Sequence, residues 1–222
     1  MNMRAMAALA LAGVFAAWPA RAVGNPPVGD QRWGDEGPTL GLTLLGGLAV
    51  PLCRDQQGCS GSLAAGPSLE GVILYAPDDA WSFGLVAEVR RGHWHDTYQG
   101  MVEGGKTYAV DSDLTSGFAG VAARYVALPA LRVAPVIQVA IGSGFQMQTG
   151  NNFHCTNGVM PTGQIAVGGR ARASKLISIF ALASASSGFK MSDCGVSDGP
   201  AATPFAGWGL GLQAGAAVDV PL

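Results

Sequence analysis

The sequence predicts an all-β protein, a closed antiparallel up-and-down transmembrane β-barrel of about eight strands. Three observations favour this fold class. Segments long enough to cross a membrane as tilted strands, about 9–11 residues or more, alternate between bulky apolar and polar or small side chains. The connections between them alternate between long and short. Charged residues make up only 13% of the chain, against about 25% in a typical soluble domain.

The N-terminus has the features of a secretory signal peptide. Arg4 supplies a positive charge, an apolar stretch runs from Ala5 to about Trp18, and Ala20-Arg21-Ala22 forms a small-x-small cleavage site. The apolar stretch is shorter than the roughly 20 residues that span a bilayer as a helix. We therefore expect residues 1–22 to be removed on export, residues 23–36 to form a short periplasmic leader, and residues 37–222 to form the barrel.

The charge of the exported chain argues against a nucleic acid partner. Removing residues 1–22 takes away two arginines and no acidic residue, which leaves 11 basic against 15 acidic residues and a net charge of −4. No run of lysine and arginine follows. Because binding to a phosphate backbone needs clustered basic side chains, we expect no nucleic acid partner.

The first four strands are expected between residues 39 and 128. In the first, the even positions from Leu40 to Val50 are mostly bulky and apolar, and the odd positions are mostly small. In the third, the odd positions from Trp81 to Val89 are apolar, and Pro77-Asp78-Asp79 before it indicates a tight turn. The expected ranges are 39–52, 65–76, 81–94 and 116–128, with a polar loop from His95 to about Asp113 before the fourth.

The last four strands are expected between residues 131 and 220. The fifth has the most regular period, with apolar side chains at the odd positions from Leu131 to Ile141. The eighth is similar, with apolar even positions from Trp208 to Val220. The expected ranges are 131–146, 162–173, 176–189 and 205–220, with polar loops around Asn151, Asn152 and Cys155 and around Cys194.

The strand count and the loop lengths agree with one topology. From a periplasmic N-terminus, the long connections all fall on the outside and the short ones in the periplasm, as in bacterial outer-membrane barrels. Over residues 39–222 the layout resembles the small eight-stranded outer-membrane barrels, a class that includes the OmpA membrane domain, OmpX and OmpW. The resemblance implies the outer membrane of a Gram-negative bacterium, reached after signal-peptide export. The chain ends on Val220-Pro221-Leu222, where members of this class usually carry a terminal aromatic residue.

Polar side chains on the small-residue faces are expected to point into the barrel. An arginine on the lipid face would cost about 2–4 kcal/mol at mid-depth, and an eight-stranded interior has room only for side chains. We therefore expect a plugged interior in which these groups pair with one another. The expected interior residues are Glu88, Arg90, Arg124, Arg132, Gln138, Gln164, Arg170, Arg172, Gln213 and Asp219.

An even number of cysteines in an exported chain indicates disulfides. The four are Cys53, Cys59, Cys155 and Cys194, and no C-x-x-C pair favours zinc instead. We expect a Cys53–Cys59 bond within the first outside loop and a Cys155–Cys194 bond that links the third and fourth loops.

His93-Trp94-His95 is the one local motif that suggests a metal. Two histidines at i and i+2 on a strand share a face, Asp96 is adjacent, and His154 could approach from another loop. Trp and His also suit the aromatic girdle at a membrane surface, and this second interpretation is the one we favour. We expect no metal and no other cofactor.

No spaced motif joins a nucleophile to a base, so we expect no enzyme activity, although a lipid-modifying barrel stays an alternative. The function we expect is a structural or surface-interaction role, in contact with outer-membrane lipid and lipopolysaccharide, as a monomer, with an extracellular partner reached through the loops. One alternative is a barrel that binds or passes a small apolar compound. Another is a soluble exported β-sandwich, which would hide the same apolar faces between two sheets.

Overall fold

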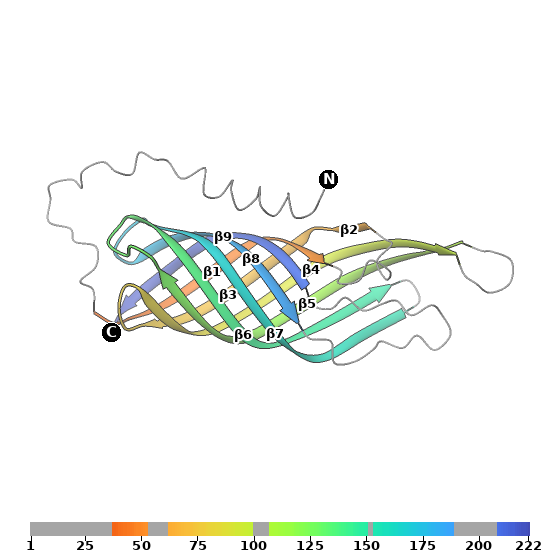
Figure 1. The fold of residues 1–222 in the computed structure, drawn as a ribbon, viewed down its shortest axis with the longest axis horizontal. Helices are drawn as coiled ribbons and strands as arrows, with labels where there is room; N and C mark the ends of the chain where they lie inside the picture. The colour runs from red at the N-terminus through yellow and green to blue at the C-terminus, as the bar shows by residue number, and fades with distance from the viewer. Residues whose placement is uncertain (1–36, 53–61, 100–106, 151–152, 189–207) are drawn as a thin grey trace.

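The computed structural model describes residues 37–52, 62–99, 107–150, 153–188 and 208–222, and nearly all of them are in β-strands (Figure 1). No helix among the described residues is long and apolar enough to cross a membrane. The strands are β1 (Thr39–Leu52), β2 (Ser62–Ala64), β3 (Gly66–Ala76), β4 (Trp81–Gln99), β5 (Thr107–Val126), β6 (Val133–Gly150), β7 (Phe153–Arg172), β8 (Ile177–Gly188) and β9 (Trp208–Pro221).

All neighbouring strands pair antiparallel, and the sheet closes on itself. β1 pairs with β9 and β3, the pairing then runs from β9 through β8, β7 and β6 to β5, and β4 joins β5 to β3. The short β2 pairs with β4 beyond the end of β3, so the two form one interrupted strand. The result is the expected closed barrel of eight strands. A β-sandwich is excluded, because its two sheets would each leave open edges.

The register sets how wide the barrel is. Paired residues followed once around the barrel from Leu40 lead back to Val50 on the same strand, a stagger of ten residues. Strand number and stagger together fix the diameter of a closed sheet, and eight strands enclose a space just wide enough for side chains. The side chains of the inner faces therefore lie close to one another across the barrel.

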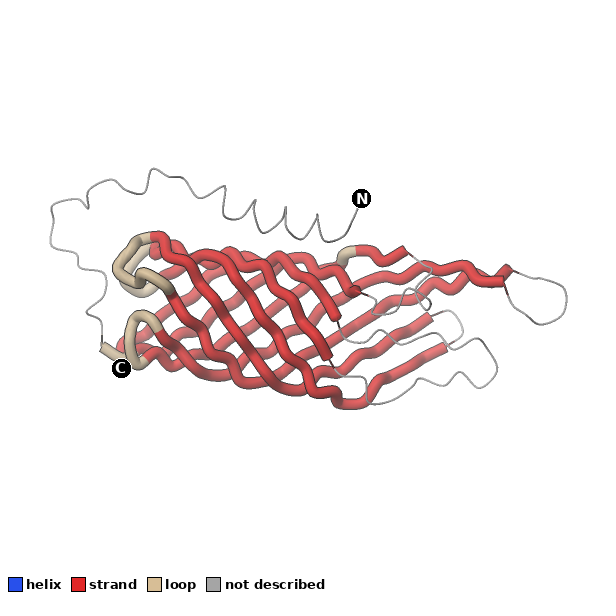
Figure 2. Tube along the Cα trace, in the orientation of Figure 1, coloured by secondary structure: helices blue, strands red, loops and turns tan. Residues whose placement is uncertain are grey.

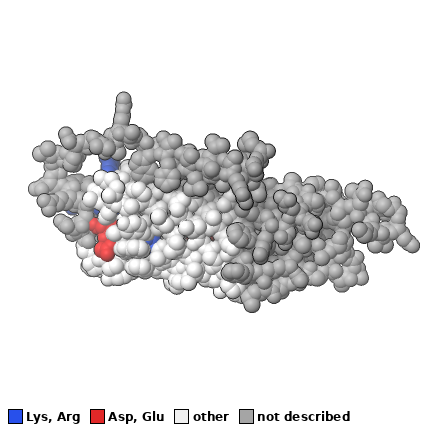
Figure 3. Space-filling model, viewed as in Figure 1, with Lys and Arg blue, Asp and Glu red and all other residues white. Residues whose placement is uncertain are grey.

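The exterior of the barrel is apolar, as the alternation predicts. Large hydrophobic side chains point outward on every strand of the barrel, with Leu85 62% and Ile141 69% exposed. In Figure 3 the described surface is almost free of charge along the barrel, and acidic and basic atoms gather near the end that carries the short turns. Inside, buried apolar side chains cluster around Leu45 and Phe180 and around Val72 and Phe118.

Four strands extend further at their outer ends than the sequence predicted, namely β4, β5, β6 and β7. The polar loop expected from His95 to about Asp113 is instead mostly a hairpin, because β4 continues to Gln99 and β5 starts at Thr107. The loop expected around Cys155 is shortened in the same way, since β7 starts at Phe153. Figure 1 shows the β4–β5 hairpin projecting well beyond the rest of the barrel. Backbone pairing extends these strands where both faces carry polar residues, so no alternation reveals them.

Short turns close the opposite end of the barrel (Figure 2). The turn between β3 and β4 is an Asx-turn, in which Asp78 Oδ1 accepts hydrogen bonds from the backbone N–H groups of Ala80 (2.8 Å) and Trp81 (2.7 Å). Between β7 and β8, Ser174 Oγ accepts from Leu176 (3.2 Å) and Ile177 (3.1 Å). Each side chain satisfies backbone donors at the start of the next strand.

Two adjacent glycines of β1 provide a test of the close strand packing. A Cβ on Gly47 would lie 1.9 Å from the backbone oxygen of Leu212, whereas a Cβ on Gly46 meets nothing within 4 Å. Gly47→Ala is therefore expected to lower the free energy of unfolding by about 1–3 kcal/mol, as overpacking does. Urea unfolding of the refolded barrel measures the change. Gly46→Ala is the matched control, and equal losses in the two variants would contradict the packing argument.

Candidate functional site

A continuous network of polar side chains crosses the interior of the barrel. Every one of the eight barrel strands supplies a member to it, and two of the members are directly opposite each other in the register, Glu70 on β3 and Glu88 on β4. In strand order the members are Thr43, Glu70, Glu88, Arg90, Arg124, Gln138, Gln164, Ser186 and Gln213.

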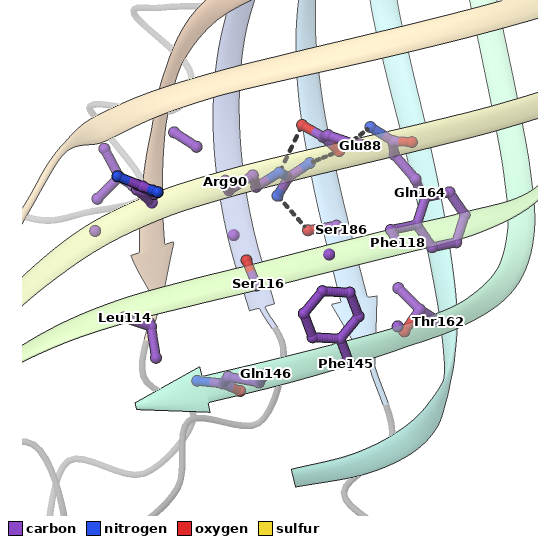
Figure 4. Close-up of a pocket in the computed structure, with 17 residues that line it drawn as sticks. Glu88, Arg90, Leu114, Ser116, Phe118, Phe145, Gln146, Thr162, Gln164 and Ser186 are labelled. Atoms are coloured by element: carbon purple, nitrogen blue, oxygen red, sulfur yellow. Dashed lines mark hydrogen bonds and ion pairs between the residues drawn. The ribbon is translucent and has the colours of Figure 1, made fainter. Parts of the chain in front are cut away.

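The Glu88 carboxylate is the most heavily hydrogen-bonded group in this network (Figure 4). Arg90, two residues along β4 on the same inner face, binds it through both Nε (2.6 Å) and Nη2 (2.7 Å). Gln213 Nε2 donates from β9 (2.8 Å) and Gln164 Nε2 from β7 (3.1 Å). The guanidinium in turn donates from Nη1 to Ser186 Oγ on β8 (2.6 Å). Such a bidentate pair, held by further donors, is the arrangement that a buried charge requires.

A second carboxylate continues the network toward the short turns. Glu70 is fully buried, and its two oxygens accept from Gln138 Nε2 (2.9 Å) and Gln164 Nε2 (3.1 Å). The Gln138 carbonyl oxygen accepts from Nε (3.0 Å) and Nη2 (2.8 Å) of Arg124. The amide of Gln138 therefore bridges the Glu70 carboxylate and the Arg124 guanidinium. The amide of Gln164 bridges the carboxylates of Glu70 and Glu88.

Arg124 forms the far end of the network. Its Nη1 donates to Thr43 Oγ1 on β1 (3.1 Å), and its guanidinium lies 4.5 Å from the centre of the Phe180 ring on β8. The network thus contains two carboxylates and two guanidinium groups, and their formal charges cancel. A neutral, hydrogen-bonded set of this kind can stay inside a barrel without a bound counter-ion.

The ten expected interior residues differ in how deeply they are buried. Seven are buried: Glu88, Arg124, Gln138, Gln164, Arg170, Arg172 and Gln213. Arg90 and Asp219 are partly buried. Arg132 differs from the expectation, because it lies in the turn before β6 and is exposed, with its Nε donating to the Arg172 carbonyl oxygen (3.4 Å). It precedes Val133, the first paired residue of β6.

Three members of the network were missed in the sequence. Glu70, Thr43 and Ser186 lie on inner faces whose other members include apolar side chains, such as Val72 and Leu74 next to Glu70. Because both faces of β3 carry apolar residues, the alternation there is weak. A lone acidic residue in an apolar strand was the available signal for Glu70, since such a charge needs a partner inside the barrel.

The structure describes only some of the cysteines and histidines singled out in the sequence. Cys53, Cys59 and Cys194 lie outside the described residues, and Cys155 is described only as a backbone position of β7 opposite Gln148. His93 is on the outer face of β4, with Nδ1 3.0 Å from Asp113 Oδ1. Among the side chains that the structure describes, no group of three or more His, Cys, Asp or Glu could hold a metal ion.

Two cavities lie on either side of the network. The outer one lies on the side of the network away from the short turns. Its lining includes Leu114, Phe118 and Gln146, together with Glu88 and Arg90 (Figure 4). The inner one lies at the end with the short turns, and its lining includes Arg124 and Asp219. At that end Arg172 Nη2 lies 3.5 Å from Asp79 Oδ1. Glu88 and Arg90 line only the outer cavity, and Arg124 lines only the inner one.

Comparison with known proteins identifies the fold and leaves the family open. No protein-family model and no curated protein matches the sequence. Among solved structures the chain is similar to Neisserial surface protein A (NspA), with a TM-score of 0.50 and 15% identity over 82% of this chain and 99% of that one. It is also similar to OprG of Pseudomonas aeruginosa (TM-score 0.45, 10% identity, 86% and 100% covered) and to Ail, the attachment invasion locus protein of Yersinia pestis (0.41, 10%, 83% and 98%). The likeness to NspA confirms the fold of the small eight-stranded outer-membrane barrels.

The central ion pair gives the next prediction. Glu88→Ala leaves the Arg90 guanidinium inside the barrel without its bidentate partner, and is expected to lower the free energy of unfolding by about 3–5 kcal/mol. Arg90→Ala should be similarly harmful, and the double variant should lose less than the sum of the two. Urea unfolding of all three variants measures this coupling. Arg91→Ala is the matched control, because Arg91 is the next residue and is exposed on the outer face. Additive losses would contradict a coupled pair.

Proposed function

We propose that this protein is an outer-membrane β-barrel of a Gram-negative bacterium with a closed interior, and that it serves as a rigid support for the structures it presents on the cell surface. The observation that carries this proposal is the polar network. All eight strands contribute to it, so opening a continuous path would separate hydrogen-bonded partners from several sides of the barrel at once. The loss of one partner from a buried charge pair already costs several kcal/mol.

The apolar exterior supports a location in a membrane. A closed barrel satisfies all of its backbone hydrogen bonds internally, which is what lipid demands of a spanning structure. Exposed side chains such as Leu42 (58%) and Leu85 (62%) would be unfavourable in water over so wide a surface. Residues 1–22 have the charge, apolar stretch and cleavage site of a signal peptide, which would direct the chain to export.

The β4–β5 hairpin is the surface structure best placed to contact a partner. On the outer face of β4 the apolar side chains end at Val89, and Arg91 and His93 follow. The two strands nevertheless remain paired as far as Gln99 and Thr107. We infer that this polar ribbon stands outside the membrane, in the medium, with its position fixed by the barrel below.

Binding of a small compound is the second candidate, and the outer cavity is the observation in its favour. Leu114 and Phe118 provide apolar surface beside the polar groups of Arg90 and Gln146, a combination found in many ligand sites. Such a ligand would bind above the network without passing through it. Replacing Phe118 would then weaken ligand binding and leave the hairpin unaffected.

The closed interior makes a direct electrical prediction. The folded protein in planar bilayers is expected to show no steady open-channel current, because the network fills the lumen. The double variant Glu88→Ala/Arg90→Ala removes side chains from this layer and should give brief currents that the original protein lacks. The heat-dependent shift of the band on SDS gels shows that each sample is folded. Steady currents from the unaltered protein would overturn the proposal of a closed barrel.

The disulfide arrangement remains a prediction that a peptide map can test. We expect Cys53–Cys59 and Cys155–Cys194 in the exported protein, as bonds that limit the movement of the outside loops. Digestion without reduction, followed by mass spectrometry, identifies the linked peptides. The same digest after reduction is the control, and a Cys53–Cys155 peptide would contradict this pairing.

A further inference from the structure

The register of the β4–β5 hairpin brings together two histidines and two aspartates. His93 is directly opposite Asp113, and His95 is directly opposite Asp111. Residues two apart on a strand share a face, so all four positions lie on one face of the hairpin. The sequence suggested Asp96 and His154 as partners of the two histidines. Asp111 and Asp113 could not be placed beside them without the register, because they follow the turn of the hairpin.

One of these pairs is already arranged as histidines are at metal centres. Nδ1 of His93 lies 3.0 Å from Oδ1 of Asp113, and both side chains are exposed, 48% and 83%. A carboxylate that accepts the Nδ1–H bond fixes the tautomer of the imidazole and its ring orientation, and the ring then ligates a metal through Nε2. Asp113 is therefore suited to position His93 for this role.

We propose that this face of the hairpin binds one divalent transition-metal ion of the zinc or copper class. The proposal rests on the juxtaposition of His93 and His95 with Asp113 and Asp111 on this face. His95 and Asp111 enter this proposal through their backbone positions in the register. Residues two apart on a strand are about 6.6–6.8 Å apart along it, and metal–imidazole bonds are about 2.0–2.1 Å long. Two imidazoles at this spacing can therefore converge on one ion.

Charge and location favour a cation of this class at the site. Arg91 is the next residue toward the membrane on the same face of β4 and carries one positive charge, whereas the two aspartates carry two negative charges. Neutral imidazole suits zinc and copper, and oxygen-rich sites suit magnesium and calcium. Because these residues follow the end of the apolar exterior at Val89, the ion would bind from the medium.

The test uses the folded full-length barrel in detergent, with any free thiol blocked by alkylation so that it cannot bind the ion. Cu²⁺ titration followed by electron paramagnetic resonance should show one ion per chain with coupling to two nitrogens. His93→Ala and His95→Ala should each remove one nitrogen from this signal. Asp113→Asn should keep both nitrogens and weaken binding by about 10- to 100-fold, as the loss of an orienting carboxylate does. Zn²⁺ should compete with Cu²⁺ for the site.

His154→Ala is the matched control, because it removes the only other histidine of the chain. It should leave affinity and the two-nitrogen signal unchanged, and the SDS-gel heat shift verifies that every variant is folded. The proposal is overturned if the unaltered folded barrel binds no Cu²⁺, if His93→Ala or His95→Ala binds as before, or if His154→Ala loses the signal. Unchanged affinity for Cu²⁺ in Asp113→Asn would contradict the role of Asp113 in positioning His93.

Discussion

The structure depends on the closure of one sheet, in which consecutive strands pair and β1 pairs with β9. Once closed, the sheet leaves no backbone group at an edge, and its strand number and stagger fix the width of the interior. Each strand must then direct one face outward and one inward. The apolar exterior, the small residues at close contacts such as Gly47, and the layer of paired polar side chains are all consequences of this narrow closed geometry.

The polar layer contributes more to specificity than to overall stability. Burying Glu70, Glu88, Arg90 and Arg124 costs desolvation energy that their contacts largely offset, so a well-packed apolar interior could be as stable. The polar layer also raises the free energy of barrels whose strands pair in a shifted register. A slip of one residue in any strand would turn its polar member toward the apolar exterior and leave its partners inside unpaired. The correct register is therefore lower in free energy than registers shifted by one residue.

Much of this fold could be predicted from the sequence, for a physical reason. A wall that faces apolar surroundings on one side and a packed interior on the other requires strict alternation, and β6 shows it from Val133 to Ile141. The prediction failed where that requirement ends. Beyond Val89 both faces of β4 carry polar residues, so the hairpin left no periodic signal. Glu70 was missed because its apolar neighbours hid the inner face of β3, and the pairing of His93 with Asp113 depends on a register that no local pattern specifies.

The contact between Gln213 and Glu88 also bears on how the barrel is completed. Gln213 is on β9, which pairs with β1 and β8, and it donates to the carboxylate of Glu88 on β4. An intermediate that lacks β9 would leave that carboxylate short of a donor and would leave β1 and β8 without their shared partner. Pairing of β9 with β1 and β8 therefore both closes the wall and completes the hydrogen bonding of a charge at its centre.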